Sequence, residues 1–113
     1  MKKYLYTLAA MALSLIMSHN ILADEQATEI HIKIQKGRFI PSEIPIAADT
    51  KVQLVIENLD DTPEEFESYD LNREVLINPL SKAAFYIGPL SPGNYQFEGE
   101  FSPQTAQGVV RVK

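Results

Sequence analysis

The sequence contains no cysteine, and most of its other soft metal ligands lie near the amino terminus. Without cysteine there can be no disulfide bond, and there is no thiolate for a zinc knot, an iron–sulfur cluster or a nucleophile. The stability of the fold must therefore come from packing. The three methionines and one of the two histidines stand at Met1, Met11, Met17 and His19, which leaves His31 as the only imidazole further along the chain.

No apolar run in the sequence is long enough for a comfortable membrane span. The run from Tyr4 to Met17 follows two lysines and precedes three polar residues, 18–20, and then Ile-Leu-Ala23. This arrangement is typical of a secretory signal peptide that is cleaved after Ala23. We therefore predict a signal peptide over residues 1–23, export to the periplasm, and one mature domain over residues 24–113. A retained N-terminal anchor is the alternative, whereas the lack of cysteine excludes a lipoprotein anchor.

The predicted mature chain is strongly acidic. Removal of the lysines at positions 2 and 3 from the ten basic residues leaves eight against fifteen acidic ones, a net charge of −7 with histidine neutral. Nucleic acid and anionic lipid are therefore poor partners. There is no phosphate-binding glycine loop, no HExxH motif and no EF-hand pattern. His31 alone gives little support for a Ser-His-Asp arrangement, and so small a domain offers little cleft for carboxylates acting on a glycan. We expect no enzymatic activity.

Alternating apolar and polar residues predict strands along nearly the whole mature chain. Isoleucines alternate with polar residues over 30–34, and Val52, Leu54 and Ile56 point one way in a second stretch. Further strands are expected at 66–71, at 74–77, at 83–87, around Tyr95 and Phe97, and at 109–113. Short strands between regular turn signals predict an all-β fold, a Greek-key β-sandwich. A small barrel such as an OB-fold is the alternative, disfavoured because barrels of that kind that bind nucleic acid usually present a basic, aromatic face.

Several short motifs follow one another in a recognisable order. They are Phe39-x-Pro41, Asn58 with Asp60, Glu65-Phe66-Glu67, Glu74, Pro92-Gly93 with Tyr95, and Gly108. In this order the sequence resembles the cupredoxins, and within them the cupredoxin-like domain of the EfeO type from bacterial periplasmic iron-uptake systems. The resemblance covers nearly the whole mature chain. It implies a cupredoxin-like Greek-key sandwich that acts beside an inner-membrane iron permease or another periplasmic component of iron uptake.

The resemblance also shows where copper ligands would be expected. A type 1 copper site needs two imidazoles, a thiolate and usually a thioether. The first histidine is expected in the region 61–65, which reads Asp-Thr-Pro-Glu-Glu, and the other ligands are expected at Gly99, Ser102 and Thr105 or Ala106. None of these residues is a soft ligand. The sequence therefore excludes a blue-copper electron carrier.

Carboxylates are what these regions offer instead. Glu65 and Glu67 stand two apart in an extended stretch and project to the same face, and Glu98 and Glu100 do the same in another. The resemblance adds Glu74 as a further acidic position. Carboxylates from separate segments suit a hard cation, and a bound cation removes their mutual repulsion. We predict a metal site with iron favoured, and with calcium, manganese or copper outside a type 1 site as alternatives.

Two alternatives to a metal site remain open. Acidic residues at alternate strand positions are often a solvated face, and the alternation of Glu98 and Glu100 with Phe97 and Phe101 fits that pattern equally well. A cupredoxin-like domain without metal could instead be an interaction module. In that case we expect the partner to bind around Phe66, Tyr69 and Phe101. His31 is expected on a solvated strand face, and one of the tyrosines Tyr69, Tyr86 and Tyr95 is a candidate corner tyrosine.

Overall fold

The computed structural model describes residues 27–113, so the predicted signal peptide lies outside the described residues. The described part of the chain folds as nine β-strands and holds no helix long and apolar enough to cross a membrane. The strands are β1 (Thr28–Gln35), β2 (Arg38–Ile40), β3 (Glu43–Ile46), β4 (Val52–Asn58), β5 (Glu64–Ser68), β6 (Arg73–Ile77), β7 (Lys82–Ile87), β8 (Gly93–Gly99) and β9 (Gln107–Val112).

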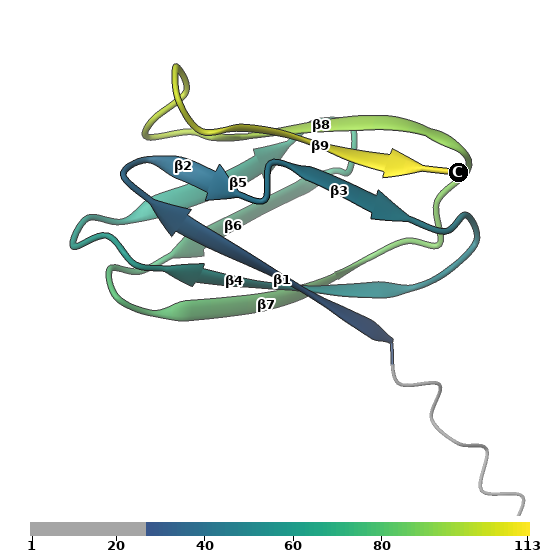
Figure 1. Ribbon diagram of the computed structural model, residues 1–113, viewed down its shortest axis with the longest axis horizontal. Helices are drawn as coiled ribbons and strands as arrows, with labels where there is room; N and C mark the ends of the chain where they lie inside the picture. Colours follow the sequence, from purple (N-terminus) through teal and green to yellow (C-terminus); the bar gives the residue numbers. More distant parts are fainter. Residues whose placement is uncertain (1–26) are drawn as a thin grey trace, which may run out of the picture.

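The strands form two sheets that pack face to face (Figure 1). The first sheet has the order β2-β1-β4-β7, and the second has the order β3-β9-β8-β5-β6. Within them β1 runs parallel to β4 and β3 runs parallel to β9, while the other neighbouring strands are antiparallel. Sequence neighbours β2 and β3 therefore lie in different sheets. The predicted all-β sandwich is confirmed.

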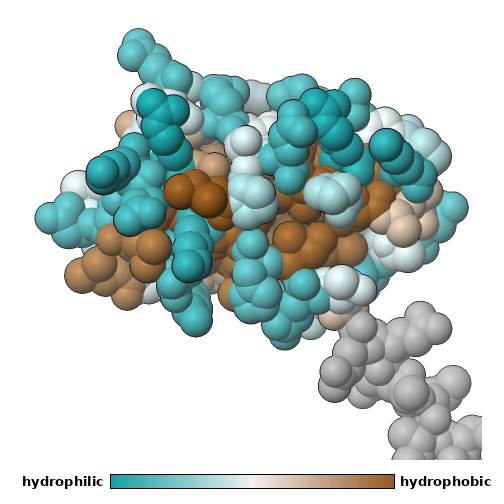
Figure 2. Space-filling model, viewed as in Figure 1, coloured by the Kyte–Doolittle hydropathy of each residue, from teal (hydrophilic) through white to brown (hydrophobic). Residues whose placement is uncertain are grey.

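The core lies between the sheets and follows the predicted alternation. Ile32 and Ile34 of β1 and Leu54 of β4 are buried, whereas His31 is exposed on the outer face as expected. Aromatic rings from both sheets fill the centre, and Phe66 stacks on Phe97 with ring centroids 4.8 Å apart. Figure 2 shows apolar side chains in a band across the middle of one view, bordered on both sides by polar ones. Burial of these side chains is the main favourable contribution to folding.

Four loops gather at one end of the sandwich, at the left in Figure 1, and we call this end the loop pole. They comprise residues 36–37, 59–63, 78–81 and 100–106. Asn58 is fully buried beneath them, and its amide group donates hydrogen bonds to the carbonyl oxygens of Thr62 and Ile77 at 2.8 and 3.2 Å. The carboxylate of Asp60 accepts hydrogen bonds from the backbone N–H groups of Lys36 and Gly37. These bonds fix the loops relative to one another.

The structure differs from the sequence prediction at β5, which was expected at 66–71 but spans Glu64–Ser68. Ser68 ends the strand because its hydroxyl group donates to Gln96 O and accepts from Leu71 N, which closes a turn. The turn also contains Asn72 at a positive φ of 51°. Among the candidate corner tyrosines, Tyr95 donates its hydroxyl hydrogen to Ser91 O at 2.8 Å, four residues upstream, as a corner tyrosine does.

Candidate metal site

The site lies on the outer face of the second sheet, close to the loop pole. Along β5 the side chains alternate, so that Glu65 and Glu67 point outward while Phe66 points into the core. The antiparallel neighbour β6 places Glu74 directly opposite Glu67 and diagonally across from Glu65. On the other side of β5, Glu100 follows the end of β8 and its N–H donates to Glu65 O at 2.9 Å. Three chain segments thus bring carboxylates together.

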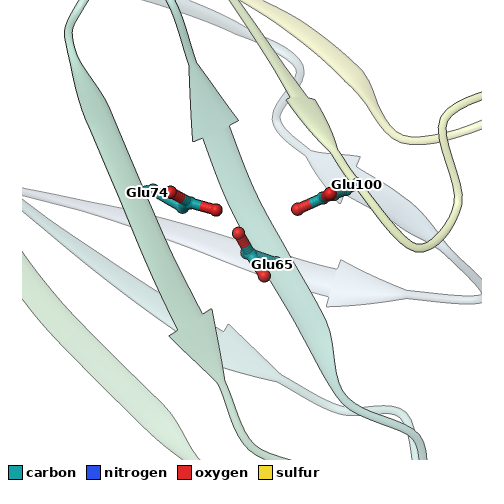
Figure 3. A group of neighbouring side chains, drawn as sticks. All are labelled: Glu65, Glu74 and Glu100. Atoms are coloured by element: carbon teal, nitrogen blue, oxygen red, sulfur yellow. The ribbon is translucent and has the colours of Figure 1, made fainter.

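Glu65, Glu74 and Glu100 form a compact group, which we call the carboxylate cluster. One carboxyl oxygen from each lies within 4.8 Å of the other two. In Figure 3 the carboxyl groups of Glu74 and Glu100 point toward each other from the two sides, with Glu65 between them. Oε1 of Glu65 is buried and accepts no hydrogen bond from any described residue. A buried acceptor without a donor is unfavourable, and either a proton or a cation would satisfy it.

The electrostatics of the cluster reflect this crowding. The pKa of Glu65 is raised from 4.5 to about 7, first because its protonated form shares a hydrogen bond with Glu74 and then with Glu100. Burial of the carboxyl group and the negative charges of Glu100 and Glu74 raise the pKa further. All of these effects favour the neutral form of Glu65 in the absence of a cation. Near neutral pH, Glu65 is therefore partly protonated in the absence of a cation.

Glu67 and Glu98 lie beside the cluster. The pKa of Glu67 is raised, mainly by burial and then by the charge of Glu100, while a hydrogen bond from Tyr69 opposes the rise. Glu98 faces Glu67 across the β5–β8 pair, and its Oε2 accepts a hydrogen bond from Gln107 Nε2 at 3.1 Å. Of the five glutamates proposed from the sequence, the structure thus brings three into one group, places Glu67 at its border and binds Glu98 to a neighbouring amide.

The prediction that Phe66 contacts a partner is wrong. Phe66 has no exposed surface, because it points into the core between the outward-facing Glu65 and Glu67. It therefore cannot belong to a binding surface. Tyr69 and Phe101 are exposed, at 86% and 52%. Sequence reasoning missed Leu76 of β6, which is about as exposed as Phe101. Leu76 could have been found, because it lies two residues after Glu74 on the same strand and so shares the outer face with it.

The positions where the resemblance places copper ligands lie at the loop pole and hold a different arrangement. Glu64 points inward and is only 3% exposed, and its Oε1 accepts hydrogen bonds from Glu65 N at 3.0 Å and Phe101 N at 2.9 Å. A β-carbon placed on Gly99 would come within 2.7 Å of the Glu64 carboxyl carbon. Thr105 donates its hydroxyl hydrogen to Gly37 O at 2.6 Å. Internal hydrogen bonds thus occupy the loop pole. Sequence reasoning missed the role of Glu64, although this residue lies two positions before Phe66 and so points inward as Phe66 does.

The geometry of the cluster fits a hard cation. Oxygen atoms that share one calcium, manganese or iron ion sit about 2.0–2.6 Å from it, and hence at most about 5 Å from one another. The 4.8 Å limit within the cluster meets that condition. Carboxylate oxygens are the ligands that such ions prefer, whereas cuprous copper prefers thiolate and thioether sulfur. The residues described contain no cysteine and hence no thiolate for type 1 copper.

Comparison with known proteins gives one family and one related sequence. Residues 6–112 match the sequence profile of a family described as "Cupredoxin-like domain". An uncharacterised protein of Rickettsia prowazekii (strain Madrid E) is 39% identical over 89 residues, which cover 79% of this chain and 71% of that protein. The family match thus includes all nine strands of the described sandwich.

Solved structures share the fold at low sequence identity. The metal-binding domain of the Cu(I)-exporting P-type ATPase CopA of Streptococcus pneumoniae D39 superposes with a TM-score of 0.66 and 15% identity, over 75% of this chain and 84% of that one. The blue copper protein auracyanin A of Chloroflexus aurantiacus gives a TM-score of 0.66 and 12% identity, over 77% of this chain and 99% of that one. Amicyanin of Paracoccus versutus gives a TM-score of 0.60 and 19% identity, over 80% and 87%.

Proposed function

The chain belongs to the family of cupredoxin-like domains, and from this premise we propose that it binds a hard metal ion through Glu65, Glu74 and Glu100. One observation carries the proposal. Three carboxylates converge from separate segments, and one of them, Glu65, has a buried oxygen, Oε1, that accepts no hydrogen bond from the described residues. A bound cation would neutralise the repulsion among them and would coordinate that oxygen. We propose a binding and delivery protein rather than an enzyme or an electron carrier.

Ferric iron is the cation that we favour, followed by manganese and calcium. A small, highly charged ion gains most from three negative ligands in a partly buried position. The resemblance to the EfeO type supports an accessory role in periplasmic iron uptake, with an inner-membrane iron permease or another uptake component as the partner. The lysines and apolar run at the amino terminus support export through a cleavable signal peptide.

The test compares metal-dependent stability in two matched double variants. Glu65→Gln with Glu74→Gln removes two ligands, while Glu29→Gln with Glu43→Gln removes the same charge at exposed positions outside the cluster. A ligand at about 100 times its Kd stabilises the native state by about 2.7 kcal/mol. Unfolding midpoints of the unmodified protein and the control should therefore rise by roughly 15 °C with ferric citrate or Mn²⁺. The cluster variant should show no rise.

A second function is favoured by the apolar residues beside the cluster. Tyr69, Leu76 and Phe101 are all more than half exposed, and Leu76 lies directly opposite Glu65 on the neighbouring strand. Exposed aromatic and aliphatic side chains near one another are typical of protein interaction sites. In this reading the domain binds a periplasmic partner without metal. Unchanged unfolding midpoints with ferric, manganous and calcium ions would rule out the metal function and favour this one.

A further inference from the structure

We propose that Glu64 is a positioning residue, whose buried carboxyl group holds Glu100 against Glu65 and so assembles the carboxylate cluster. The inference rests on the proposed function for its consequence, which is metal affinity. Its structural part stands on the contacts of Glu64 itself. Glu64 contributes no ligand, because its side chain points into the sandwich while the cluster lies on the outer face.

The first argument is the way in which the pairing of β5 with β8 ends. Backbone pairing places Phe66 opposite Gly99, and beyond that pair the N–H of Glu100 still donates to Glu65 O. The next amide, Phe101 N–H, donates instead to Oε1 of Glu64 at 2.9 Å. A side-chain oxygen of β5 thus binds an amide that lies beyond the last main-chain bond between the two segments.

The second argument is that side-chain burial does not anchor this part of the loop, which is held by backbone bonds, such as the one from Ser102 N–H to Gly99 O at 3.1 Å, and by Glu64. Phe101 is 52% exposed, so burial of its ring does not anchor the chain there. Glu64 is 3% exposed and its carboxyl carbon lies close beside Gly99, where a β-carbon would approach it within 2.7 Å. The carboxyl group therefore occupies space that the glycine leaves free. A buried acceptor with two N–H donors is also a fixed one.

The backbone of Glu100 is held at two peptide N–H groups, its own and that of Phe101. Its own N–H is bonded to Glu65 O, and the following N–H is bonded to Glu64 Oε1. Together the two bonds restrict the backbone on both sides of Glu100 and direct its side chain toward Glu65. Ligand groups must be held to within a fraction of an ångström for tight binding, and supporting hydrogen bonds provide that precision.

The test replaces Glu64 in two ways and follows Mn²⁺ binding by titration calorimetry. Glu64→Leu keeps the approximate size but removes the acceptor, and we expect Mn²⁺ affinity to fall about 10–100-fold, as for other residues that orient metal ligands. Amide hydrogen exchange of Phe101 should become faster. Glu64→Gln retains an acceptor oxygen, and it should restore both the affinity and the slow exchange.

A control separates positioning from general stability. Val112→Ala creates a core defect in β9 at the opposite end of the sandwich, and it should lower the unfolding midpoint without lowering Mn²⁺ affinity. If Glu64→Leu binds Mn²⁺ as the unmodified protein does, the inference is wrong and the metal function stands. If the unmodified protein binds no metal, the proposed function is wrong, and amide exchange of Glu100 and Phe101 in Glu64→Leu still decides the positioning.

A measurement on the unmodified protein tests the inference even if Glu64→Leu does not fold. A hydrogen bond transmits a weak NMR coupling between the donor nitrogen and the acceptor carbon, here Phe101 N and the carboxyl carbon of Glu64. We expect this coupling to be detected in the full chain, and to persist in Glu64→Gln, whose side-chain carbonyl oxygen accepts the same hydrogen bond. Absence of the coupling in the unmodified protein would overturn the inference.

Discussion

Glu64 and Glu65 are neighbours on β5 with the same side chain, yet they lie in opposite environments. Glu64 points into the loop pole, is 3% exposed, and its Oε1 accepts two backbone hydrogen bonds. Glu65 points to the outer face, where its Oε1 is buried without a donor and two further carboxylates lie within 4.8 Å. The inner residue is satisfied by the protein, and the outer residue is satisfied only by a proton or a cation.

This contrast suggests different roles for the two residues: Glu64 supports the structure, whereas Glu65 is available to bind an ion. A carboxyl group whose acceptor oxygen is already occupied by amide donors has little to offer to an ion, whereas a crowded one gains stability from any positive charge. At the loop pole, where the resemblance places copper ligands, the residues have structural contacts instead. Gly99 packs closely against Glu64, and Ser102 and Thr105 form hydrogen bonds within the protein. We therefore expect metal binding at Glu65, the next residue along β5, which lies on the opposite, outer face of the second sheet.

The largest effect is expected if the packed pole is given one more carbon atom. In Gly99→Ala the new β-carbon would lie 2.6 Å from the Ala106 β-carbon and 2.7 Å from the Glu64 carboxyl carbon. Ala106 is fully buried, so neither neighbour can move without disturbing the core. Overpacking of this kind lowers the free energy of unfolding by about 3 kcal/mol, or roughly 15 °C in midpoint. Thermal unfolding measures it.

The exposed Gln104 on the same loop offers the control, and Gln104→Ala should leave the midpoint within about 2 °C. A Gly99→Ala protein as stable as the original would mean that the pole has room to spare. In that case Glu64 would not be tightly held, and its contrast with Glu65 would lose its structural basis.

The sequence predicted the fold and the outward direction of Glu65 and Glu67, because both follow from a period of two residues. It predicted five glutamates as ligands but could not tell that Glu74 and Glu100, and not Glu67 or Glu98, would share a group with Glu65. That choice depends on the register of β5 against β6 and β8, which the turns determine. The turn after Ser68 sets the first register, and the Glu64–Phe101 hydrogen bond acts at the end of the second. Neither can be read from alternation.

A second prediction concerns pH and the outer face. The pKa of Glu65 is about 7 in the folded protein and 4.5 is its ordinary value, so between these pH values the native state binds more protons than the unfolded state. The free energy of unfolding of the metal-free protein should therefore fall as pH rises from about 4.5 to 7, and then level off. Mn²⁺ affinity should rise over the same range, because the metal must displace the proton.

Chemical denaturation at a series of pH values, with Glu65→Gln as the comparison, measures this dependence. The variant cannot ionise at position 65, so its stability should change less between pH 5 and 8 than that of the unmodified protein. A control variant, Glu64→Gln, alters the neighbouring position on the inner side and should retain the fall. Identical pH profiles for the unmodified protein and Glu65→Gln would show that the carboxylates of the cluster do not interact.

The smallest effect is expected at the border of the cluster. The pKa of Tyr69 is raised above 10, first by the negative charge of Glu67 and then by the hydrogen bond that its hydroxyl group donates to that carboxylate. Glu67→Gln removes the charge, so the phenol should ionise at lower pH, while the free energy of unfolding changes by no more than about 0.5 kcal/mol. NMR titration of the Tyr69 ring measures the shift, and Glu43→Gln on the same sheet should produce none. Tyr69 is 86% exposed. If its pKa is raised only while Glu67 can ionise, the negative charge that acts on Tyr69 comes from Glu67 and not from the cluster around Glu65.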